Sequence, residues 1–174
     1  MMNIIVKEAK RWRVLYTKPR SEKRAFELLE CQDYHVYLPC TTVVRQWTDR
    51  KKKVIEPVFK SYLFINCFEK EIHTAVQCPH IIGVVKFENK PAIVREEEIE
   101  AIRQIVAGKE DITVVNNHEH FVTGQRVHII SGNLKGLSGI LTEFRGARKL
   151  AIAIDSLGCN LFVEVAAHHT EPVP

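Results

Sequence analysis

Residues 121–139 read FVTGQRVHIISGNLKGLSG, and this stretch decides the expected fold of the C-terminal part of the chain. Val127 and Ile129 alternate with polar neighbours, which is the pattern of a half-buried β-strand. The strand must then turn tightly at the Ser-Gly-Asn sequence, where glycine supplies the positive backbone angles that such turns need. Gly136 and Gly139 permit a close approach of the backbone, or a bulge, as the next strand starts.

The rest of the C-terminal part continues the same pattern of short strands and turns. Glycines at 132, 136, 139, 146 and 158 would each weaken a helix. We therefore predict a small β-barrel at rest. A phosphate-binding loop is disfavoured because the glycine cluster lacks a following Gly-Lys-Ser/Thr ending. The expected strands are Gln125–Ile130, Leu137–Glu143, Lys149–Ile154 and Asn160–Val165.

The N-terminal part mixes strand and helix patterns. Ser21 is a plausible N-cap for a helix through about Gln32, and three glutamates from Glu96 begin a second helix that ends at Gly108. A polar stretch from 109 to 120 shows no periodicity and predicts a linker. The remaining expected elements are strands at Trp12–Tyr16, Tyr62–Ile65 and Ile82–Phe87, a helical segment at Glu69–Gln77, and a hairpin of Tyr34–Val44 with Lys53–Val58 that has a basic tip.

Composition excludes several classes of protein. The 174 residues are 45% hydrophobic, and no apolar stretch approaches the roughly 20 residues of a membrane-spanning helix. The first ten residues lack a secretory pattern, so we expect a cytoplasmic location. Five dispersed cysteines suggest neither a disulfide framework nor a zinc site. The formal charge of +4 is small, but basic residues predominate up to Lys60, so one face of the first half could meet phosphate.

Four stretches of the chain carry a resemblance to a known family. The stretch 121–139 resembles a KOW motif, the leading hairpin of SH3-like barrels in transcription and ribosomal proteins. Residues 11–20 (RWRVLYTKPR), 37–39 (YLP) and 56–65 (EPVFKSYLFI) resemble, in that order, the NusG N-terminal domain. The chain thus resembles transcription elongation factors of the NusG/RfaH type, and is closest to UpxY-like specialised antiterminators.

The chain departs from the family pattern at two points. Lys60-Ser61 stands where the family commonly has proline-glycine or proline-asparagine before the tyrosine. In Ile72-His73-Thr74, which is similar to the element that RfaH-type factors use against the gate loop of the polymerase, Ala75 replaces the next threonine.

The resemblance implies an α+β fold in two domains. An NGN-like antiparallel sheet flanked by helices would occupy residues 1–108, a linker 109–120, and an SH3-like KOW barrel 121–174. It implies a monomeric factor that binds bacterial RNA polymerase and non-template DNA and suppresses pausing and termination at particular operons. The KOW domain would recruit the ribosome or a termination or antitermination factor. No enzymatic activity, cofactor, metal or membrane association is implied.

The resemblance also implies binding residues. An apolar concavity would grip the polymerase clamp through Tyr16, Phe59, Tyr62 and Phe64, and His73 and Thr74 would contact the gate loop. Lysine and arginine would hold phosphate, while glutamine could read a base edge. The candidate nucleic-acid contacts are Lys18, Arg20, Lys23, Arg24 and Gln32 around the first helix and Arg50, Lys51, Lys52 and Lys53 at the hairpin tip.

Purely structural roles explain many of the same residues. Strand alternation would bury some of the aromatic residues in the core, and for Phe64 a core position is at least as good an interpretation. A solvated helix face accounts equally well for the charges around the first helix. A housekeeping NusG-type factor, or a ribosome- or RNA-binding KOW module that does not act on polymerase, remains the alternative function.

Overall fold

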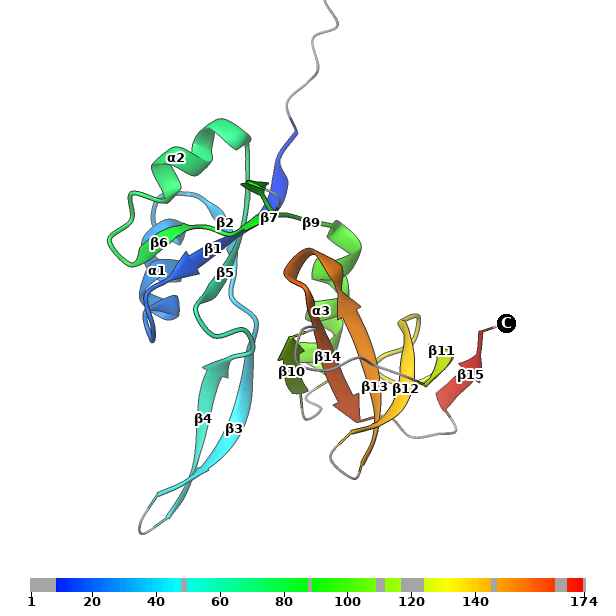
Figure 1. The fold of residues 1–174 in the computed structure, drawn as a ribbon. Coiled ribbons are helices and arrows are strands. Elements are labelled where there is room, and N and C mark those ends of the chain that lie inside the picture. Colours follow the sequence, from blue (N-terminus) through cyan, green and yellow to red (C-terminus); the bar gives the residue numbers. More distant parts are fainter. Residues whose placement is uncertain are drawn as a thin grey trace, which may run out of the picture. The chain divides into compact units, whose positions relative to one another are not determined.

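The computed structural model describes residues 9–47, 50–87, 89–108, 112–116, 124–144, 147–164 and 169–173 (Figure 1). The chain divides into two compact units, which are described separately. The first contains residues up to Leu38 together with Lys60–Arg95, and the second contains Pro39–Phe59 and Glu96–Pro174. None of the described helices is long and apolar enough to cross a membrane.

The first unit is built on an antiparallel sheet of order β2-β5-β1-β6, with β9 also paired to β1 (Figure 1). Strands β1 and β5 lie close to their expected positions. The strand expected at Ile82–Phe87 is divided into β6 and β7, and the helix expected at Glu69–Gln77 is shortened to η1 and α2. A two-stranded ladder of β7 and β8 adds to the unit. The elements are β1 Arg11–Thr17, α1 Glu22–Glu30, β2 His35–Tyr37, β5 Tyr62–Cys67, η1 Glu69–Glu71, α2 Ile72–Ala75, β6 Ile81–Val84, β7 Lys86–Phe87, β8 Lys90–Pro91 and β9 Ile93–Val94.

One face of this sheet packs against α1 and α2. Leu15 of β1 and Leu63 of β5 are directly opposite each other, and both are fully buried. Leu29 of α1 and Ala75 of α2 belong to the same hydrophobic cluster. The core therefore forms where the amphipathic helices cover the inward-facing residues of two adjacent strands.

Helix α1 begins after Ser21, as expected, but ends two residues before Gln32. Ser21 occupies the N-cap position without a side-chain capping hydrogen bond. At the other end Asp33 has φ 62°, and the Tyr34 amide donates to the Leu29 carbonyl at 3.1 Å. A left-handed residue that closes a helix in this way reverses the chain, and this explains the early end.

The turn before β5 depends on a buried carboxylate. Ser61 has φ 62°, the left-handed conformation that glycine or asparagine adopts with least strain. Its amide donates to Glu22 Oε1 at 2.7 Å, and its carbonyl accepts from the Thr17 amide at 2.8 Å. Glu22 is only 7% exposed. Ser61 thus holds a backbone conformation that glycine or asparagine would adopt with less strain.

The second unit contains a hairpin of β3 (Cys40–Gln46) and β4 (Lys51–Pro57). The strand expected over Tyr34–Val44 is in fact two strands, because the chain leaves the extended ladder at Pro39 and His35–Tyr37 pairs with β5 instead. The second unit also contains α3 (Glu96–Ala107) and an antiparallel sheet of order β10-β14-β13-β12-β11-β15 (Figure 1). All four strands expected from the sequence are present. The sheet elements are β10 Ile112–Asn116, β11 Gln125–Ile129, β12 Ser138–Phe144, β13 Ala147–Ile154, η2 Asp155–Leu157, β14 Cys159–Glu164 and β15 Thr170–Pro172.

Two glycines of the KOW-like stretch behave as expected. Gly132 has φ 82° in the turn between β11 and β12. A Cβ at Gly139 would lie 2.5 Å from the Ala151 carbonyl oxygen, which no side chain tolerates without movement. Glycine is therefore required at 139 by the close approach of β13.

Helix α3 is joined to loops of the second unit by side-chain hydrogen bonds. The Gln104 amide donates to the carbonyls of Asn133 and Lys135 at 3.0 and 2.7 Å. The Ser156 amide donates to Glu98 Oε1 at 3.2 Å. Within the expected linker, the structure describes residues 112–116, and these form β10, which pairs with β14.

We predict that Glu22→Ala destabilises the turn before β5. It leaves the Ser61 amide without its carboxylate acceptor, and an unsatisfied buried donor costs about 1–3 kcal/mol. Hydrogen exchange of the Ser61 amide should accelerate by roughly tenfold or more. Glu27→Ala, which removes an exposed glutamate from the same helix, is the matched control and should leave that rate unchanged. Equal exchange in both variants would show that the carboxylate does not hold the turn.

We also predict that Cys159 resists alkylation in the folded protein. Burial, and then the negative charge of Glu98, raise the pKa of the Cys159 thiol to about 12. At pH 8 the thiol therefore stays protonated, and the thiolate is the reactive species. Mass spectrometry after iodoacetamide treatment should find the exposed Cys31 labelled and Cys159 unlabelled until denaturant is added. Early labelling of Cys159 would contradict its burial.

Candidate functional site

Two tyrosines form the accessible part of the aromatic candidate site. Tyr16 of β1 and Tyr62 of β5 are register partners, and their ring centroids lie 5.9 Å apart in an edge-to-face arrangement. Tyr16 is 42% exposed and Tyr62 is half-buried. Both rings lie on the sheet face opposite Leu15 and Leu63, because successive residues of a strand point to opposite faces. Rigid strands therefore present a paired aromatic surface.

The other two aromatic candidates are buried. Phe64 is fully buried, and its ring centroid lies 6.1 Å from that of Tyr37. Phe59, which belongs to the second unit, is 4% exposed. In this structure neither phenylalanine offers surface to a partner. Sequence reasoning already weighed a core position for Phe64.

The basic residues before and within α1 gather at one end of the helix. The Ser21 amide donates to the Lys18 carbonyl at 3.1 Å, and Arg20 has φ 59°, which with Pro19 is the pattern of a type II turn. Lys18, Arg20, Lys23 and Arg24 are all exposed. The positive end of the helix dipole adds to their potential, so this turn is suited to an anion.

Gln32 lies away from this basic turn. It follows the opposite end of α1, whose nine residues span roughly 13 Å at 1.5 Å per residue. The side chain is exposed. The structure therefore does not bring Gln32 together with Arg20, although both were predicted to face nucleic acid.

The gate-loop candidates lie on a short helix. His73 and Thr74 of α2 are both exposed, whereas the neighbouring Ile72 and Ala75 are buried in the core. Burial raises the pKa of the Tyr34 hydroxyl, Glu71 and Cys67 raise it further, and a hydrogen bond with Thr74 opposes the shift. His73 and Thr74 thus both face solvent, and Thr74 also contacts Tyr34.

The basic tip of the hairpin is exposed throughout its described part. Arg50, Lys51, Lys52 and Lys53 all face solvent. One further cation of the hairpin is already occupied, because the Arg45 guanidinium forms a bidentate pair with the Glu56 carboxylate at 2.9 and 2.7 Å. The Lys52 ammonium lies 5.6 Å from the ring centroid of Trp47. Trp47, an aromatic residue beside this basic tip, was not among the candidates named from the sequence.

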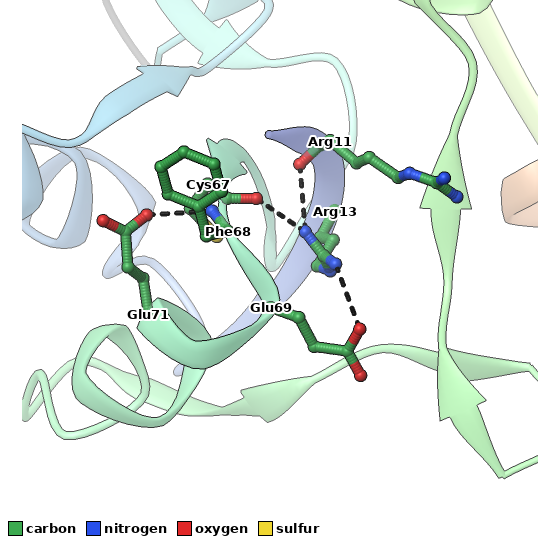
Figure 2. Close-up of polar contacts among 6 residues, drawn as sticks. All are labelled: Arg11, Arg13, Cys67, Phe68, Glu69 and Glu71. Atoms are coloured by element: carbon green, nitrogen blue, oxygen red, sulfur yellow. Dashed lines mark hydrogen bonds and ion pairs between the residues drawn. The ribbon is translucent and has the colours of Figure 1, made fainter. Parts of the chain in front are cut away.

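Arg13 is a basic residue that serves the fold. Its guanidinium is buried and donates to the Cys67 and Arg11 carbonyls at 2.7 and 3.3 Å, with Glu69 3.9 Å away (Figure 2). The Phe68 amide donates to the Glu71 carboxylate at 2.8 Å in the same region. These contacts fix the end of β5, so Arg13 is excluded from the nucleic-acid surface. Among the described residues, no cluster of His, Cys, Asp and Glu could hold a metal ion.

Comparison with solved structures shows a NusG-like fold. The chain is similar to a chain of the structure titled "Domain interaction in Thermotoga maritima NusG", at 20% identity and a TM-score of 0.57, over 95% of this chain and 98% of that one. It also aligns with a chain of an MjSpt4:Spt5 complex at 16% identity, over 93% and 96% of the two chains, but the TM-score of 0.33 establishes no shared fold.

The family follows from the sequence match. Residues 10–103, more than half of the chain, match the family described as "Transcription termination factor nusG". This range includes the tyrosine pair, the basic turn and the hairpin described above. The family is one of transcription factors and not of enzymes. The chain belongs to the NusG family.

Proposed function

We propose that the chain is a transcription elongation and antitermination factor that binds RNA polymerase and suppresses pausing and termination at particular operons. The observation that carries this proposal is the tyrosine pair of Tyr16 and Tyr62 on the first unit. Aromatic anchors held by rigid elements contribute much of the binding energy at protein interfaces. The buried Phe59 and Phe64 would not contact the partner directly.

The proposed mechanism is a shift in the population of polymerase conformations. The first unit would grip the clamp through the tyrosine pair and reach the gate loop through His73 and Thr74. A factor that binds the closed clamp better than the open one by about 1.4 kcal/mol changes the ratio of the two states tenfold. The chemistry of nucleotide addition stays with the polymerase.

The basic surfaces would hold DNA in the same complex. Lys18, Arg20, Lys23 and Arg24 would contact phosphates of the non-template strand, and Gln32 would reach a separate part of that strand. The basic hairpin tip would add contacts with DNA that do not depend on sequence. The expected KOW barrel would recruit the ribosome or a termination or antitermination factor.

We predict that Tyr62→Ala weakens binding to purified bacterial RNA polymerase by about 30-fold, the effect of losing a central aromatic anchor. Tyr62→Phe keeps the ring and should restore most of the affinity. Biolayer interferometry measures the affinities, and single-round transcription on a pause-rich template should show faster pause escape only with variants that bind.

Ile130→Ala is the control, because it removes an exposed apolar side chain from the second unit. If Tyr62→Ala and Tyr16→Ala bind polymerase as tightly as wild type does, the polymerase contact lies elsewhere. No binding to polymerase, with recovery of ribosomal subunits from lysate, would instead support a ribosome- or RNA-binding module. An effect on every template would indicate a housekeeping factor.

We further predict that Arg20→Gly weakens DNA binding without lowering the stability of the fold. Glycine suits the left-handed backbone at this position, so the fold should be kept while one phosphate contact is lost. The affinity for an elongation complex should fall, and the slope of log affinity against log salt should decrease by about one. Asn89→Gly is the matched control, because it removes a comparable strain (φ 67° against 59°) at an exposed neutral residue and changes no charge. Equal affinities of the two variants for the elongation complex would show that Arg20 does not contact DNA.

A further inference from the structure

The chain has two tryptophans in opposite environments. Trp12 of β1 is 2% exposed, whereas Trp47, which follows β3 in the hairpin, is 52% exposed. A buried tryptophan contributes to the core, but an exposed one adds little to folding. The side chain of Trp47 is therefore available for a contact with a partner.

The hairpin holds Trp47 in place. Its amide donates to the Arg50 carbonyl at 2.8 Å, and its own carbonyl accepts from the Gln46 side chain at 3.1 Å. The Lys52 ammonium lies over the ring, 5.6 Å from its centroid. The backbone that carries the ring is therefore fixed, which lowers the conformational cost of binding a ligand there.

The face of the hairpin that carries Trp47 is also basic. Arg45 and Lys52 are register partners, so their side chains share one face, and Trp47 lies on that face two residues after Arg45. Glu56 neutralises Arg45 by a bidentate pair. Lys52 remains as a cation beside the ring, and Arg50, whose carbonyl accepts from the Trp47 amide, is exposed. The opposite face carries Val44, 60% exposed, and Lys53, which are also register partners.

We infer that Trp47 stacks on an unpaired DNA base while Arg50 and Lys52 hold the adjoining phosphates. A flat aromatic face beside cations matches the two parts of a single-stranded nucleotide, its base and its phosphate. A duplex presents the same phosphates but hides the base faces in its stack. This inference rests on the proposed function, which brings the first half of the chain to the opened DNA strands.

The test is the binding of the full-length protein to a fluorescein-labelled thymidine oligonucleotide of about 12 nucleotides. Trp47→Ala should weaken this binding about tenfold and leave binding to a duplex of the same sequence nearly unchanged. Trp47→Phe keeps an aromatic face and should recover part of the loss. Unlabelled oligonucleotide should quench the intrinsic tryptophan fluorescence of wild type and protect that fluorescence from quenching by acrylamide. It should have neither effect on Trp47→Ala.

Two variants of the opposite face serve as controls. Val44→Ala should change neither affinity nor quenching. Lys53→Gln removes one charge, so it should weaken single-stranded and duplex binding by the same factor and leave the quenching at saturation intact.

Three outcomes would overturn the inference. They are equal binding of wild type and Trp47→Ala, an equal loss on duplex and single strand, and tighter binding of a uridine RNA than of the thymidine DNA. The oligonucleotide assay contains no polymerase, so its failure is separate from a failure of the tyrosine pair to bind polymerase. Trp47→Ala should bind polymerase that carries no nucleic acid as wild type does.

Discussion

The register between β1 and β5 is the constraint on which the first unit depends. Six consecutive residue pairs, from Arg11 opposite Cys67 to Tyr16 opposite Tyr62, join the two strands. A slip of one residue would turn the leucines of the core toward the tyrosine face and the tyrosines toward the helices. The Glu22 carboxylate and the Ser61 turn fix the start of β5, and the buried Arg13 guanidinium fixes its end. Polar contacts at both ends thus set the position of an apolar pairing.

The sequence was sufficient to predict most of the secondary structure. Apolar runs and alternation predicted the longer strands of both units, and the acidic start of α3 was recognised, but the short strands β8, β9 and β15 were not predicted. The same patterns could not show that Ser61 and Arg20 adopt left-handed conformations, because each is held by the surrounding chain and not by its own preference. They also could not show that residues 112–116 form a strand, since its partner β14 lies more than forty residues later. Long-range pairing is the information that local patterns lack.

The charges of the first half illustrate a second limit of the sequence. A count of basic residues treats all of them alike, but the fold assigns them different environments. Arg13 is buried against backbone carbonyls, and Arg45 is paired with Glu56. Lys18, Arg20 and the hairpin tip are exposed. The surface that could bind phosphate is therefore smaller and more localised than the net charge suggests. Burial likewise reduced the four aromatic candidates to the two accessible tyrosines.

The pairing of β10 with β14 also bears on how the chain behaves in a crowded solution. An uncovered edge strand exposes a row of backbone donors and acceptors that can pair with another molecule. Strand β14 contains the apolar sequence Leu-Phe-Val, which has a high tendency to form such contacts. Strand β10 satisfies that edge along five residue pairs, from Ile112 opposite Val163 to Asn116 opposite Cys159. The segment that follows α3 therefore protects this sheet from self-association at β14.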